Sequence, residues 1–83
     1  MEHRNKPIEE YKHVKSILSI NHINVSDYQL IDYGLQFTVS ILGWSGVIRI
    51  YQNKKGVLKI DYSQLNGGAN TIKIQTLIEG KKI

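Results

Sequence analysis

Hydrophobic positions between Pro7 and Ile20 recur every three or four residues, which is the spacing of one face of an amphipathic helix. The stripe consists of aliphatic and aromatic residues, namely Ile8, Tyr11, Val14, Ile17 and Leu18. Pro7 suits the first helical turn, where a backbone N–H is not needed. Glu9 and Glu10 follow near the start, where negative charge complements the helix dipole. The pattern therefore predicts an N-terminal helix from Pro7 to about Ile20.

After the polar pair Asn21-His22 this helical period disappears, and apolar and polar residues begin to alternate. A period of two is typical of a strand with one buried and one solvated face. The alternation is clearest in the second of four predicted strands, where Leu35, Phe37, Val39 and Ile41 are the apolar members. The four strands are expected over about 28–31, 35–41, 47–51 and 57–62.

Two short glycine-containing segments separate the last three of these strands. They are Gly43-Trp44-Ser45-Gly46 and Asn53-Lys54-Lys55-Gly56, both of which read as turns. Connections this short bring consecutive strands side by side in opposite directions. The sequence therefore predicts an antiparallel meander.

Asn66-Gly67-Gly68 ends the sheet region, and residues 70–79 after it permit two interpretations. Ile74, Leu77 and Ile78 fit one helical face, and Gly80 stands where a helix C-cap belongs. The β-branched residues Thr71, Ile72, Ile74 and Thr76 suit a fifth strand instead. We expect a helix, and the fold class is then α+β: an N-terminal helix, an antiparallel four-stranded β-meander and a C-terminal helix packed on one sheet face.

Length and composition agree with one small folded domain spanning residues 1–83. The chain has 83 residues, of which 41% are hydrophobic and 22% charged, close to ordinary globular composition. It contains no cysteine, which excludes disulfides, thiolate zinc sites and cysteine nucleophiles. No apolar stretch is long enough to span a membrane, and no signal core follows the N-terminus. We therefore expect a cytoplasmic protein that does not contact membranes.

The charge balance directs attention to the solvated face of the predicted sheet. Eleven basic and seven acidic side chains give a net charge of +4, which is compatible with a polyanionic partner and equally with simple solubility. Gln36, Thr38 and Ser40 share the polar face with three cationic or aromatic residues. We expect nucleic-acid contacts from Arg49, Tyr51 and Lys59 on this face and from Lys54 and Lys55 at the hairpin tip. The competing interpretation is an ordinary solvated sheet face.

A protein partner, or a second copy of the chain, is the alternative. Trp44, the sole tryptophan, is predicted to lie in a turn, where its ring either anchors a partner or folds back over the sheet. An exposed sheet edge offers a second route, because a partner strand can add to it. The alternative function is thus a protein-interaction or regulatory module, such as an inhibitor, an antitoxin-like protein or a homodimer.

Catalytic chemistry is not indicated by any motif. The segment Gly43-Trp44-Ser45-Gly46 lacks the second glycine of a nucleophile elbow, because position 47 is valine. His3, His13 and His22 have no metal-ligand or catalytic spacing with a carboxylate. We therefore predict a non-enzymatic module without a metal or cofactor.

The order of elements resembles that of TATA-binding-protein-like domains, including the N-terminal accessory domains of class-three ribonucleases H and of some toxin ribonucleases. The resemblance rests on Ile48 to Tyr62, with its Asn-Lys-Lys-Gly turn, on Asn66 to Asn70, and on the helix ending at Gly80, about a third of the chain. It implies an open sheet face that grips nucleic acid, with contacts from Arg49, Tyr51 and Lys59.

Overall fold

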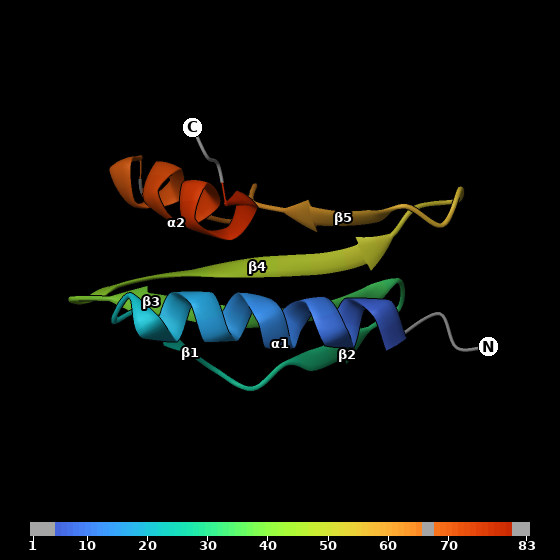
Figure 1. Cartoon of the computed structure of the whole chain (residues 1–83), viewed down its shortest axis with the longest axis horizontal. Helices are drawn as coiled ribbons and strands as arrows, with labels where there is room; N and C mark the ends of the chain where they lie inside the picture. Colours follow the sequence, from blue (N-terminus) through green and yellow to red (C-terminus); the bar gives the residue numbers. More distant parts are fainter. Residues whose placement is uncertain (1–4, 66–67, 81–83) are drawn as a thin grey trace.

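The computed structural model describes residues 5–65 and 68–80, so the first two residues of the predicted break Asn66-Gly67-Gly68 lie outside the described residues. The elements, in chain order, are α1 (Asn5–Ile20), β1 (Asn24–Val25), β2 (Gln29–Ile31), β3 (Gly34–Ile41), β4 (Trp44–Gln52), β5 (Leu58–Asp61) and α2 (Ala69–Glu79) (Figure 1). The α+β class is confirmed. The predicted N-terminal helix is confirmed as well, with a start at Asn5 instead of Pro7.

One antiparallel sheet contains all the strands, in the order β1-β3-β4-β5, with β2 also paired to β3. The predicted meander is confirmed in β3, β4 and β5, which pair consecutively. The described chain has five strands and not the predicted four, because the segment from 24 to 31 pairs with β3 in two separate places. β1 and β2 therefore form one interrupted edge of the sheet.

A bulge causes that interruption. Between the pairs Val25↔Val39 and Gln29↔Gln36, the edge segment advances four residues while β3 advances three. Ser26 holds the bulge in place, because its N–H donates to the Thr38 carbonyl and its Oγ accepts the Thr38 N–H, both at 2.9 Å. A side-chain oxygen thus replaces a backbone carbonyl in the ladder. The extra residue reverses the alternation of faces along the edge.

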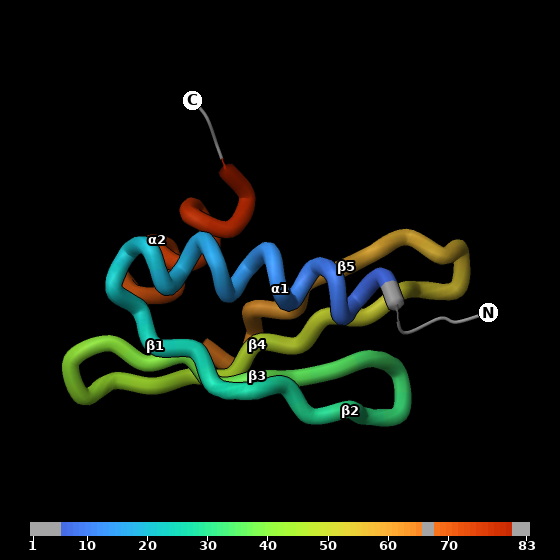
Figure 2. The backbone as a smooth tube through the Cα atoms, turned by 60° about the horizontal axis from the view of Figure 1, so that its bottom comes forward, coloured from blue at the N-terminus to red at the C-terminus, as the bar shows by residue number. Residues whose placement is uncertain are grey.

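Both helices lie on the same side of the sheet (Figure 2). Helix α1 packs over β1, β3 and β4, while the main neighbour of α2 is α1. The expectation that the C-terminal helix packs on the sheet face is therefore only partly correct, since α2 follows the short edge strand β5 and comes to lie beside α1. The core draws its buried side chains from helices and strands alike: Tyr11, Val14, Leu18, Ile23, Leu35, Phe37, Val39, Ile48, Ile50, Leu65, Ile74 and Ile78.

The segment 69–79 is a helix, as expected, and the strand interpretation is wrong. Ile74 and Ile78 are buried, which is the face that the helical spacing indicates. Gly80 closes the helix in the left-handed conformation, with φ 61°, and its N–H donates to the Thr76 carbonyl. Packing of two isoleucines against the core thus outweighs the β-branched composition of the segment.

The turn between β3 and β4 differs from the prediction. Ile41 pairs with Trp44, which leaves Leu42 and Gly43 as a two-residue turn, and Trp44-Ser45-Gly46 belongs to β4. Both turn residues have positive φ, 45° and 86°, as the mirror-image turns of tight hairpins require. Asparagine and glycine are the usual occupants of such turns. Because leucine is unusual in the first position, the sequence does not indicate a turn at Leu42-Gly43, and the segment from Gly43 to Gly46 was predicted to be the turn instead.

Leu42 provides a test of this turn. Its side chain is fully exposed, so it gains nothing from burial, while left-handed backbone costs an ordinary residue about 1 kcal/mol or more. We expect Leu42→Asn to raise the free energy of unfolding by about 0.5–1 kcal/mol in urea denaturation, because asparagine tolerates this conformation. Leu42→Val, which adds a β-branch, should lower it; a lower value for both variants would contradict the turn.

Candidate functional site

A row of polar side chains crosses the outer face of the sheet, the face that the helices leave uncovered. Strand register places Gln29, Gln36, Arg49 and Asp61 next to one another on four successive strands. The Arg49 Nε donates to the Gln36 Oε1 at 3.1 Å, and the Gln36 Nε2 donates to the Gln29 Oε1 at 3.4 Å. These bonds engage one nitrogen of the guanidinium, and within the described chain its terminal amino groups have no hydrogen-bond partner. The bond to Gln36 therefore orients the guanidinium and leaves the N–H groups of its terminal amino groups available to a ligand.

Asp61 completes the row and reduces its positive charge. Hydrogen bonds from the hydroxyl and the backbone N–H of Ser63 hold the pKa of Asp61 below its ordinary value of 3.8, and the Arg49 guanidinium lowers it further. Asp61 is therefore ionised at neutral pH. The predicted cationic surface is thus divided, with a carboxylate standing between Arg49 and the solvent beyond β5.

A second row contains Gly34, Tyr51 and Lys59, paired across β3, β4 and β5. Gly34 is required here, because a Cβ at this position would lie 2.9 Å from both Cα and Cβ of Tyr51. The Tyr51 ring makes an edge-to-face contact with Tyr33, with centroids 5.6 Å apart and planes at 79°. Exposed Tyr33, half-buried Tyr51 and exposed Lys59 therefore form an aromatic and cationic platform.

The turn after β4 presents two further lysines. The Asn53 Oδ1 accepts the N–H groups of Lys55 and Val57, at 2.9 and 3.0 Å, and Gly56 adopts the positive φ that closes the turn. These bonds fix the backbone, and the side chains of Lys54 and Lys55 are left exposed. The two lysines thus extend the cationic platform beyond the end of the sheet.

A hollow of about 350 Å³ opens on the same face. Its walls are Ile31, Asp32 and Tyr33 from the β2–β3 hairpin, together with Gln36 and Arg49. Gly34 lies within this group in the strand register and contributes no side chain. The hollow therefore combines a guanidinium, a carboxylate, an amide and an aromatic ring, a set that suits a flat ligand with both donors and acceptors.

The predicted contact residues are placed in three ways. Arg49, Tyr51 and Lys59 share the outer face, and Lys54 and Lys55 lie at the tip of the same hairpin, so all five belong to the β4–β5 hairpin, with the Asp61 carboxylate beside Arg49. Trp44 lies on the inner face at the far end of β4, half-buried against the core. A Cβ at Gly46 would lie 3.2 Å from the indole of Trp44 and 2.6 Å from Leu65, so the ring folds back over Gly46. Its role in partner binding stays a prediction.

Sequence reasoning missed Asp32 and Tyr33. They occupy a two-residue turn, and their part in the hollow depends on β2 pairing with β3, which the alternation pattern did not reveal. The cluster Asp32-Tyr33-Gly34 between two apolar segments was the available signal, because such residues are typical of a hairpin turn.

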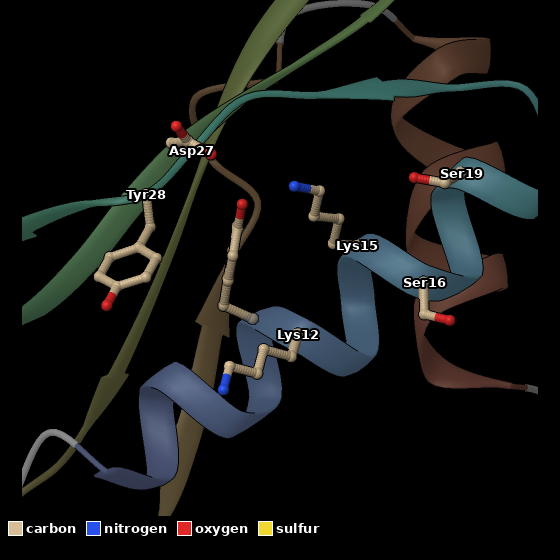
Figure 3. A pocket seen from close by; sticks show the side chains of 7 residues that line it. Lys12, Lys15, Ser16, Ser19, Asp27 and Tyr28 are labelled. Atoms are coloured by element: carbon tan, nitrogen blue, oxygen red, sulfur yellow. The ribbon is translucent and has the colours of Figure 1, made fainter.

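A second hollow, of about 500 Å³, lies on the other side of the molecule, between α1 and the bulge. Figure 3 shows Lys12, Lys15, Ser16 and Ser19 projecting from the helix and Asp27 and Tyr28 from the edge segment. The bulge turns Tyr28 toward Tyr11, whose ring centroid is 5.0 Å away. This aromatic contact fastens α1 to the edge of the sheet, and we assign the groove a structural role.

Tyr62 has an enclosed hydroxyl that makes no hydrogen bond of normal geometry within the described residues. Burial raises the pKa of Tyr62 well above its ordinary value, and the carboxylates of Glu79 and Glu10 raise it further. The phenol therefore stays protonated at physiological pH and provides no base.

Among residues 5–65 and 68–80, no group of three histidine, aspartate or glutamate side chains is placed to hold a metal ion. No described helix has both the length and the apolar character needed to cross a bilayer. The chain matches no protein-family model, no curated protein and no solved structure. Function is therefore inferred from the surface chemistry of the outer face. 

Tyr11 offers a test of the contact between α1 and the bulge. Its hydroxyl donates to the Ser26 carbonyl at 2.7 Å, so we expect Tyr11→Phe to lower the free energy of unfolding by about 1 kcal/mol. Tyr28→Phe is the matched control, because the Tyr28 hydroxyl makes no hydrogen bond within the described chain. Equal losses in urea denaturation for the two variants would show that the Tyr11 hydrogen bond does not secure the bulge.

Proposed function

We propose that this chain is a small, non-enzymatic binding module that holds single-stranded nucleic acid, RNA or DNA, on the outer face of its sheet. The observation that carries the proposal is the meeting of Arg49, Tyr51 and Lys59 on a face that neither helix covers. Rings that stack on bases and cations that pair with phosphates are the components of sequence-tolerant single-strand binding.

The distribution of charge favours the lysines as the phosphate contacts. Lys54, Lys55 and Lys59 are exposed and lie on one hairpin, whereas Arg49 is half-buried and faces Asp61. The strand of nucleic acid would then follow the β4–β5 hairpin, with bases turned toward the tyrosines. The resemblance of the element order to TATA-binding-protein-like domains points in the same direction.

Salt dependence is the first test. Three or four phosphate contacts predict micromolar affinity at low salt and a decline of log K with log [salt] of slope about −2 to −3, since each contact to a single strand contributes about −0.7. Fluorescence anisotropy of a labelled uridine dodecamer, measured across a salt series, checks both values. The absence of any binding at low salt would remove the proposal.

A pair of double variants locates the contacts. We expect Lys54→Ala with Lys55→Ala to flatten the salt slope by about 1.4, because two phosphate contacts are lost. Lys12→Ala with Lys15→Ala removes the same charge from the helical side, where neither ammonium is ion-paired within the described chain, and should leave the slope unchanged. Equal effects of the two double variants would mean either that the nucleic acid binds elsewhere on the surface or that the attraction depends only on the net charge of the chain.

A protein-interaction module is the second candidate, and Leu42 is the observation that favours it. This residue is fully exposed at the tip of the β3–β4 hairpin on left-handed backbone, and Ile20 is 74% exposed at the end of α1. A partner surface that packed against these side chains would remove their apolar area from water.

Light scattering measures whether the chain associates with a second copy of itself. If the partner is a second copy, the chain has the mass of a dimer at micromolar concentration, and Leu42→Asn restores the monomer. A monomer in the unmodified chain would exclude the homodimer.

A further inference from the structure

The hollow on the outer face has a chemical composition that selects among nucleobases. We infer that it is a guanine-binding subsite, in which Arg49 and Asp32 read two adjacent edges of the base. This inference rests on the proposed function, because it names the nucleotide that the same face prefers.

Arg49 supplies donors in a fixed orientation. Its Nε is engaged by the Gln36 Oε1 at 3.1 Å, and Gln36 is in turn held by Gln29. The terminal amino groups are left for a ligand, and the guanidinium fork matches two adjacent acceptors. Guanine presents such a pair, O6 and N7, and arginine is their usual partner in proteins.

Asp32 supplies acceptors in the same hollow. Its side chain is exposed at the β2–β3 turn and forms no ion pair within the described chain. The N1–H and N2–H₂ groups of guanine are two parallel donors, which a carboxylate accepts through its two oxygens. Guanine is thus complementary to the cation at one edge and to the anion at the other.

Adenine has the opposite arrangement of polar groups. Its N6 amino group would face the Arg49 donors, and its N1 acceptor would face the Asp32 carboxylate, so both edges would be mismatched. Uracil offers a single ring N–H and lacks the second donor. The hollow therefore discriminates against adenine and uracil because these bases leave polar groups unpaired, and not because of their size.

The shape of the hollow agrees with one nucleotide. A volume of about 350 Å³ is at the small end of the range for ligand sites. Tyr33 lines the hollow, and its ring is supported by an edge-to-face contact with Tyr51, with the two ring planes at 79°. Ile31 adds an apolar wall. A base can stack on the tyrosine while its edges reach Arg49 and Asp32.

Three RNA hexamers test the inference on the full chain: uridine throughout, and the same hexamer with one central guanosine or adenosine. We expect anisotropy at low salt to show the guanosine hexamer binding about tenfold more tightly than the adenosine hexamer. Equal binding of all three would overturn the guanine subsite and leave the proposed function standing. Binding of none would overturn both.

Two variants assign the preference to the hollow. Asp32→Ala should remove the preference for guanosine over adenosine, because the two parallel donors of guanine lose their acceptor. Asp27→Ala makes the same charge change at an exposed residue outside this hollow and should retain the tenfold ratio. A retained ratio in Asp32→Ala would contradict the inference.

Arg49→Lys gives a second, independent readout. Lysine keeps the charge but not the planar fork, so the ratio should fall while the salt slope stays the same. Circular dichroism verifies that each variant is folded. If Arg49→Lys fails to fold, the turn variant Asp32→Ala decides the matter, since its side chain is exposed.

Discussion

The sheet depends on β3, which pairs with β4 along its whole length and with β1 and β2 on its other side. Its inward residues Leu35, Phe37 and Val39 are almost completely buried, and the helices close over them. Such a strand has no freedom of register, because a shift by one residue would carry its apolar set into water. The same constraint fixes the polar residues between them on the outer face.

The outer face follows from this register and not from any local motif. Gln36 meets Arg49 because Phe37 meets Ile48 one step further along the pair. The orientation of the guanidinium is thus a consequence of core packing on the opposite side of the same strand. A residue-by-residue link of this kind makes the position of Arg49 on the outer face as stable as the core packing that supports it.

Much of the fold was predictable because its signals are periodic. The spacing of Tyr11, Val14 and Leu18 predicts α1, and alternation predicts β3 and the common face of Arg49, Tyr51 and Lys59. The parts that were not predictable depend on pairing across strands or on unusual turn residues. Leu42 has a positive φ, a conformation that favours asparagine or glycine, so its identity does not indicate a tight turn. Trp44 was therefore predicted to lie in a turn, whereas it is the first residue of β4. The hollow forms because Asp32 and Tyr33 lie near Arg49 in the folded chain. No spacing of residues along the sequence indicates this proximity.

The bulge at Ser26 gives the edge segment a constraint of a different kind, one on the number of residues. Removing a single residue between Val25 and Gln29 would restore uninterrupted alternation in the pairing with β3, and the side chains on one side of the deletion would change faces. Tyr28 could then no longer meet Tyr11 while Gln29 meets Gln36. The length of this segment is therefore under stronger constraint than the identity of its exposed residues, and insertions or deletions here are more disruptive than exchanges.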